Sequence, residues 1–317
     1  MLSRSRAALL FLACVLAFLA TLFPSTRAHQ IEAPEVPAAA QGPPRLAVLI
    51  VFDQMRGDYL KRWQKLYGTG GFRRLCTEGA WFTNCHYPYA NTVTAAGHAS
   101  IATGCSPAEH GIVGNDWYDR RTGEKVNCVA DGRYERVPYL PARSGLPLMP
   151  GEELERTNIS PERLLAPTIG DALKAATHGA GRVVSLSLKE RSAVLPAGRH
   201  PDACYWFDSG SGLFVTSTYY RERLHPWLVD FNRSRLADRW FGLSWRRLRP
   251  DLNYALYSGP DDVPTEGLGI GQGRTFPHSL TVGKPRYYQA LTNSPFGNDL
   301  LLELARQAID GEGLGNG

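Results

Sequence analysis

The chain has 317 residues, of which 43% are hydrophobic, so it is long enough to form one large domain or two modest ones. Its formal net charge is +5, and it falls to +2 once residues 1–28, which hold three arginines and no acidic residue, are set aside. The basic charge is therefore no argument for nucleic-acid binding.

The amino terminus predicts export. Arg4 and Arg6 precede an almost wholly apolar stretch, Ala7–Phe23, and small residues around Ala28 suit cleavage. We expect a signal peptide over 1–28, a periplasmic or secreted protein, and no stable membrane insertion after cleavage. The alternative is a retained anchor, although 17 apolar residues are short for a bilayer span. Five cysteines follow residue 28, and one or two disulfides are expected in an oxidising compartment.

Residues 29–44 are rich in Pro, Ala and Gln and predict a linker. The folded part is expected to begin at Arg45. Leu46–Phe52 is a continuous apolar run that predicts a strand buried on both faces of a parallel sheet. Asp53 follows this run, and the carboxyl ends of such strands are where open α/β sheets bind ligands.

The later elements alternate between helical and strand patterns. Helices are expected over 56–66, 71–79, 94–103, 167–179 and 298–309, strands over 80–89 and 183–188, and hairpins over 115–131 and 205–219. The last helix is expected to bury Leu301, Leu302, Leu304, Ala305 and Ala308. Residues 138–160 are expected to leave the core, and the Pro-rich and aromatic residues 225–292 to form a cap or insert. This order predicts an α/β domain with a mainly parallel sheet flanked by helices.

Thr94 is the candidate nucleophile. A threonine hydroxyl becomes reactive when a metal ion stabilises its alkoxide, and the start of a small-residue helix favours both alkoxide and phosphate. Thr92 could do the same, and a threonine before a helix can also be a simple N-cap. Asp53 could share the metal with the alkoxide, or it could cap a turn.

Three further polar residues could bind phosphate. Asn115 could donate from its amide, although Gly114-Asn115 could instead form a turn. Lys189 and Arg191 are two residues apart, so in an extended chain both would face one site, or both could lie at a solvated edge. His98 and His110 are interpreted as buried structural histidines in preference to metal ligands.

Four segments resemble the alkaline phosphatase superfamily. They are Val-Phe-Asp53-Gln-Met-Arg-Gly-Asp-Tyr, Thr-Val-Thr94-Ala-Ala-Gly-His-Ala-Ser, His-Gly-Ile-Val-Gly-Asn115-Asp-Trp and Ser-Leu-Lys189-Glu-Arg191. The likeness is to periplasmic phosphate-irrepressible alkaline phosphatases with a threonine nucleophile, which are related to type I phosphodiesterases and nucleotide pyrophosphatases, and it runs from about residue 45 to 317.

The resemblance implies a role for each site residue. Thr94 would become a phosphothreonine, Asp53 and Thr94 would bind one of two zinc ions, and Asn115, Lys189 and Arg191 would hold the phosphoryl oxygens. In the family, further Asp and His ligands follow the helix equivalent to 298–309, and these motifs do not occur here. We therefore expect an alkaline-phosphatase-like domain over 45–317 that is truncated at its carboxyl end and inactive as written.

The leading functional hypothesis is a zinc-dependent phosphate monoester hydrolase acting on small-molecule esters. Its expected state is monomeric, without nucleic-acid polymers as partners. A phosphodiesterase or nucleotide pyrophosphatase is the alternative, because such enzymes share the Asp, Thr and Asn but would replace the two cations by an apolar site. A non-catalytic fragment that binds anions or partners is the third hypothesis.

Overall fold

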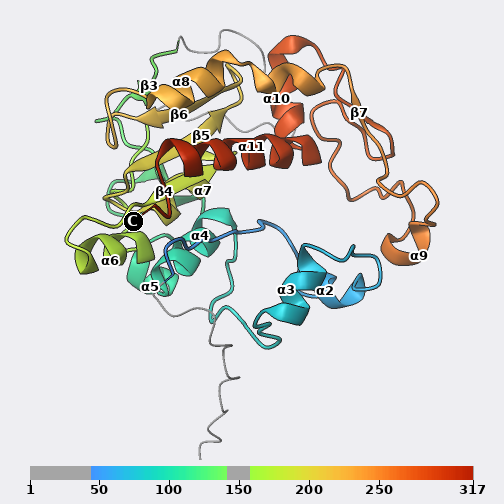
Figure 1. The fold of residues 1–317 in the computed structure, drawn as a ribbon, viewed down its shortest axis with the longest axis horizontal. Helices are drawn as coiled ribbons and strands as arrows, with labels where there is room; N and C mark the ends of the chain where they lie inside the picture. The colour runs from blue at the N-terminus through green and yellow to red at the C-terminus, as the bar shows by residue number, and fades with distance from the viewer. Residues whose placement is uncertain (1–43, 141–157, 317) are drawn as a thin grey trace, which may run out of the picture. The chain divides into compact units, whose positions relative to one another are not determined.

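The computed structural model describes residues 44–140 and 158–316, and Figure 1 shows their arrangement. The expected signal peptide, nearly all of the expected linker and most of the excursion at 138–160 lie outside these described ranges. The residues from Arg45 onward belong to one unit of internal contacts. This unit contains every candidate site residue.

A four-stranded sheet organises the unit, in the order β3 (Arg136–Val137), β6 (Leu213–Ser217), β5 (Ala203–Asp208) and β4 (Val184–Ser187). Only β4 and β5 pair in parallel, whereas β5–β6 and β3–β6 are antiparallel. The α/β class is confirmed, but the expectation of a mainly parallel sheet is corrected to a mixed one. The reason is local: β5 and β6 are joined by a tight turn, which imposes antiparallel pairing.

Strand β5 separates two cores because successive side chains point to opposite faces. Cys204 and Trp206 pack with α4 (Thr94–Thr103) and α7 (Glu190–Ala197). On the other face, Tyr205 and Phe207 pack with residues of three helices: α8 (Pro226–Arg233), α10 (Lys284–Thr292) and α11 (Pro295–Gly311). Helices therefore cover both faces of the sheet, as Figure 1 shows for α7 and α11.

The prediction that Leu46–Phe52 forms a buried strand is wrong. The segment has no strand assignment, and its apolar side chains are exposed, 64% for Val48 and 66% for Ile50. A strand requires a hydrogen-bonded neighbour, and none of the strands in residues 44–140 and 158–316 pairs with this run. The predicted strand over 80–89 is also wrong, since it consists of bends and irregular chain.

Other expected elements are confirmed, with shifted ends. The hairpin pairs β1 (Asp116–Asp119) with β2 (Glu124–Asn127), and α6 (Ile169–Ala176) begins after the N-cap Thr168. The helices expected over 56–66 and 71–79 are shorter, as α2 (Tyr59–Arg62) and α3 (Phe72–Glu78). Elements that were not expected are α5 (Pro107–His110), η1 (Leu236–Trp240), α9 (Ala255–Ser258), and β7 (Ser244–Trp245) paired with β8 (His278–Ser279).

Helix α11 is longer than expected and buries Leu304 and Ala308 as predicted, but Leu302 is exposed. Gly297, Leu300, Leu304 and Ala308 are its buried residues, whereas Leu302 is 55% exposed. The buried positions follow the three- and four-residue spacing of one helical face, which Leu302 does not share. The expected disulfides are also corrected, because all five cysteines of the described residues are unpaired.

Candidate active site

Thr94 is the first residue of α4, and its side chain faces Asp53. The preceding Val93 is extended, with φ −64° and ψ 164°, and occupies the N-cap position, so Thr94 is not a simple cap. The Thr94 hydroxyl donates a hydrogen bond to Asp53 Oδ2 at 3.0 Å, and Thr94 is only 7% exposed. Thr92 is exposed and lies outside the helix. Of the two candidate threonines, Thr94 is the one placed beside the carboxylate.

Asp53 lies in a turn after the exposed segment 46–52 and is itself exposed. The next residue, Gln54, has a left-handed backbone with φ 61°, which turns the chain away immediately after the carboxylate. Asp53 therefore reaches the start of α4 although the expected strand before it is absent. Thr94 and Asp53 thus bring together two oxygen atoms that could bind a metal ion, joined here by one hydrogen bond.

Asn115 joins the start of α4 to the β1–β2 hairpin. Its side-chain Oδ1 accepts a hydrogen bond from the Ala95 backbone N–H at 2.9 Å. Its backbone carbonyl accepts from Asn127 Nδ2 at 3.1 Å and from Cys128 N at 2.9 Å. The carboxamide oxygen is thus fixed on the helix N-terminus, and the amide –NH₂ is left as a donor for an incoming oxygen.

Lys189 and Arg191 stand where β4 passes into α7. Lys189 is the N-cap residue of α7, and Arg191 lies in its first turn, 4% exposed, with an ion pair to Glu190 Oε1 at 3.1 Å. The expectation that an extended chain directs both cations to one side is corrected, because the helix begins between them. Their common location instead comes from the packing of α7 against α4.

The pKa of His98 depends on the charged residues around α4. It is buried, and its Nδ1 donates to the Thr94 carbonyl at 2.8 Å. Burial is the main cause that lowers the pKa of His98; the Thr94 carbonyl and Asp53 oppose this shift, and Arg191 and Lys189 add to it. The carboxylate and both cations thus act on the same buried ring of α4.

His110 has a structural position. It is fully buried, its Nδ1 accepts from Ile112 N at 3.1 Å, and its Nε2 donates to the Ser100 hydroxyl at 2.9 Å. Burial lowers the pKa of His110 and favours the neutral ring that this bonding pattern needs. Within residues 44–140 and 158–316, no three His, Cys, Asp or Glu side chains gather into a metal-binding group.

The comparisons identify the family. The sequence profile described as type I phosphodiesterase / nucleotide pyrophosphatase matches residues 47–265. The chain belongs to this family. The chain is 40% identical over 277 residues to alkaline phosphatase PafA of Elizabethkingia meningoseptica, covering 86% of this chain and 48% of the relative. It is 39% identical over 273 residues to alkaline phosphatase PhoV of Synechococcus elongatus, covering 86% and 47%.

A solved structure gives the same result for the fold. A crystal structure of PafA with four substitutions superimposes with a TM-score of 0.76 at 38% identity, covering 87% of this chain and 51% of that one. The resemblance to the alkaline phosphatase superfamily is therefore confirmed. The chain spans about half the length of the curated relatives it matches.

Two residues that contact the candidate site residues were not found from the sequence. Glu190 pairs with Arg191, and Asn127 donates to both the Asn115 carbonyl and Asp116 Oδ1, at 3.1 and 3.0 Å. Hairpin register could have found Asn127, because it is the strand partner of Asp116. No sequence signal separates Glu190 from an ordinary acidic residue in the first turn of a helix.

Proposed function

We propose that the protein is a phosphate monoester hydrolase in which Thr94 is the nucleophile. The observation that carries the proposal is the buried Thr94 hydroxyl, bonded to Asp53 at 3.0 Å at the start of α4. A helix N-terminus favours negative charge, and the backbone N–H groups there point towards it. A second support is the crystallised PafA variant, whose four substitutions fall on one threonine, one asparagine, one lysine and one arginine. These are the residue types that we single out.

Each residue has a defined task in the proposed reaction. Thr94 Oγ1 attacks the phosphorus atom in line with the departing alcohol, so the new P–O bond forms as the ester P–O bond breaks. The hydroxyl proton passes to Asp53 Oδ2, to which it is hydrogen-bonded, and the departing alkoxide takes a proton from solvent. Asn115 donates to a phosphoryl oxygen, and Lys189 and Arg191 supply positive charge. Water then hydrolyses the phosphothreonine and releases inorganic phosphate.

The proposed cofactor is a pair of zinc ions, of which Asp53 and Thr94 would hold one. Two hard oxygen donors 3.0 Å apart suit a divalent cation, which would supply the charge that stabilises the deprotonated threonine. Zinc takes four ligands in proteins, and the described residues bring no group of three metal-binding side chains together. We therefore propose that these residues alone bind zinc weakly and have little activity by themselves.

The alternative function is a phosphodiesterase or nucleotide pyrophosphatase. The family description favours it, and so does the Glu190–Arg191 ion pair at 3.1 Å, because a paired arginine offers less net charge to a dianion. We prefer a monoester because Lys189 and Arg191 lie at the start of α7, which packs against α4, and two cations there match the second charge of a monoester. A diester has no such charge.

The proposed setting follows from the amino terminus and from the substrate. We propose an exported protein that acts as a monomer on small phosphate esters in the periplasm or outside the cell. Among the residues that the structure describes, none of the helices combines the length and the apolar character needed to cross a membrane.

The test compares p-nitrophenyl phosphate with bis-p-nitrophenyl phosphate as substrates of the zinc-loaded complete gene product. We expect a higher kcat/KM for the monoester, and Lys189→Ala should reduce it more for the monoester than for the diester. Thr94→Ala should lose turnover of the monoester, and Thr92→Ala, which should keep it, is the matched control. A preference for the diester would establish the alternative. Phosphate binding without turnover in the zinc-loaded protein would instead indicate a binding fragment.

A further inference from the structure

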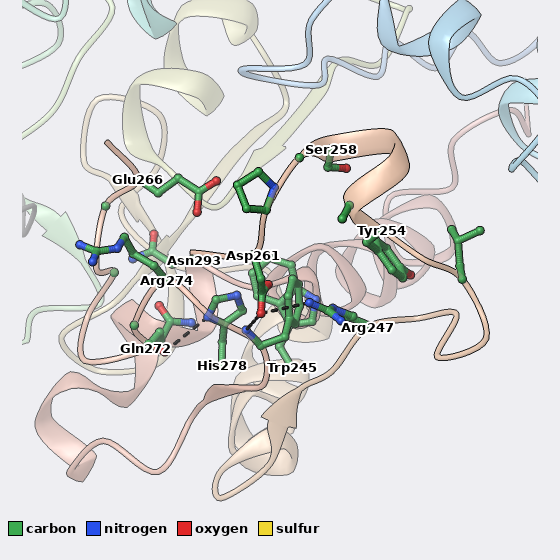
Figure 2. Close-up of a pocket in the computed structure, with 18 of the residues that line it drawn as sticks. Trp245, Arg247, Tyr254, Ser258, Asp261, Glu266, Gln272, Arg274, His278 and Asn293 are labelled. Carbon is green, nitrogen blue, oxygen red and sulfur yellow. Dashed lines mark hydrogen bonds and ion pairs between the residues drawn. The ribbon is translucent and has the colours of Figure 1, made fainter. Parts of the chain in front are cut away.

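A cavity of about 510 Å³ lies within the insert, apart from the proposed catalytic residues. Its walls come from residues between Trp245 and His278 together with Asn293, and Figure 2 shows the side chains that line it. Thr94, Asp53 and the other proposed site residues do not line it. A volume in this range suits a small organic molecule.

One wall is aromatic and packed. Trp245 lies 5.3 Å from Phe276 and 4.9 Å from His278, measured between ring centroids, and Phe276 lies 4.4 Å from His278. His278 is 9% exposed, so the cluster is anchored in the insert at β8. Such a wall offers flat apolar surface, and stacking on aromatic side chains is a common way to bind planar rings.

The cavity already contains a cation on its aromatic faces. The Arg247 guanidinium lies over the rings of Tyr254 and Phe276, 5.5 and 5.6 Å from their centroids. It also pairs with Asp261 at 3.0 Å. A cationic ligand would have to displace this guanidinium or approach it against charge repulsion. The lining is therefore poorly suited to an ammonium ligand.

The carboxylates make the lining equally unsuited to a phosphate. Arg274 also lines the cavity, and its charge is matched by Asp262 at 2.8 Å. Glu266 adds a further negative charge. With each arginine paired to an aspartate and an extra carboxylate present, a dianionic ester would meet no net positive charge. A neutral ligand fits this balance best.

Two polar side chains are available to such a ligand. Glu266 and Asn293 are exposed at the edge of the cavity, and within the described ranges their side chains form no hydrogen bond to protein, whereas the lining residue Gln272 donates to the Ala290 carbonyl at 3.2 Å. A carboxamide can pair with the N6 and N7 atoms of adenine, and a carboxylate accepts from amino groups. We propose that this cavity binds a neutral purine nucleoside, with its base against Trp245 and His278 of the aromatic wall and its polar edge on Asn293 and Glu266.

Isothermal titration of the 317-residue chain with adenosine tests the proposal. We expect saturable one-to-one binding, weakened about fivefold by Asn293→Ala, the effect of losing one hydrogen bond. The matched control is Asn298→Ala, an exposed asparagine of α11 outside the cavity. Circular dichroism verifies that each variant is folded.

Further titrations separate this site from the proposed catalysis. Thr94→Ala should bind adenosine as the wild type does, because Thr94 does not line the cavity. Adenosine monophosphate should bind more weakly than adenosine, and methyl glucoside should not bind. The proposal is overturned if millimolar adenosine gives no binding heat, if the monophosphate or the sugar binds as well as the nucleoside, or if Asn293→Ala leaves affinity unchanged.

Discussion

Two substitutions of Asn115 separate its structural task from its proposed chemical one. Asn115→Ala removes both the acceptor of the Ala95 N–H and the proposed donor to phosphate. Asn115→Asp keeps an oxygen that can accept from Ala95 N at the 2.9 Å position, but it removes the donor. It also places a negative charge at the start of α4. The helix dipole favours a negative charge there, whereas a bound phosphate is repelled by it.

The magnitudes follow from burial. Ala95 is fully buried, so Asn115→Ala leaves its N–H without an acceptor, at a cost of about 1–3 kcal/mol. For a domain of this size, that lowers the Tm by roughly 5 °C. Asn115→Asp should melt close to the wild type. Both variants should lose about 10²–10³ in kcat/KM for a monoester, the usual effect of removing one donor to a developing charge, with Asn115→Asp the slower.

Thermal unfolding of the 317-residue chain gives the first quantity, and monoester kinetics of the complete zinc-loaded gene product give the second. Asn298→Asp in α11 is the control for an added charge at an exposed position. The reasoning is refuted if Asn115→Asp retains wild-type kcat/KM, or if Asn115→Ala melts at the wild-type temperature.

Three further predictions concern stability. Burial lowers the pKa of His110 below its ordinary value of 6.5, so its contribution to the unfolding free energy is present above pH 6.5 and is lost as the pH falls through the folded pKa. The unfolding free energies measured with urea at pH 7.5 and at pH 5.5 should therefore differ less in His110→Gln than in the wild type. Arg136→Ala strands the buried carboxylate of Asp208 and should cost about 3–5 kcal/mol by the same assay; a cost under 1 kcal/mol would contradict this. Ile50→Glu, at an exposed position, should change stability by less than about 0.5 kcal/mol, and a larger loss would mean that the segment is buried.

Local patterns made much of the fold predictable. Helix α4 begins at Thr94 and ends at Thr103, as expected from its run of small residues closed by Gly104, whose φ of 69° suits glycine at a helix end. The β1–β2 hairpin and strand β4 were also expected from turn residues and apolar runs. These elements depend on residues close together in sequence.

The rest depends on partners that sequence patterns do not show. Leu46–Phe52 has the composition of a buried strand, but a strand exists only when another chain segment pairs with it. Leu302 shows the same limit for helices, since the neighbours of α11 decide which apolar stripe is buried. The cavity lined by residues 245–278 and Asn293 depends on several short segments packing together, so no local sequence pattern predicts it.

The candidate site was predictable as a set of residues, and its geometry was not. Spacing could not separate Thr92 from Thr94, whereas the 3.0 Å contact with Asp53 does. The role of Asn115 as acceptor for the helix N-terminus, and the pairing of Arg191 with Glu190, required coordinates.

Mapping the covalent intermediate tests the proposed function most directly. The zinc-loaded complete gene product is mixed with a phosphate monoester and quenched in acid, and the phosphorylated residue is located by tandem mass spectrometry. We predict phosphate on Thr94, its disappearance in Thr94→Ala together with turnover, and its persistence in Thr92→Ala. Phosphate on another residue, or undiminished turnover by Thr94→Ala, would contradict the proposed mechanism.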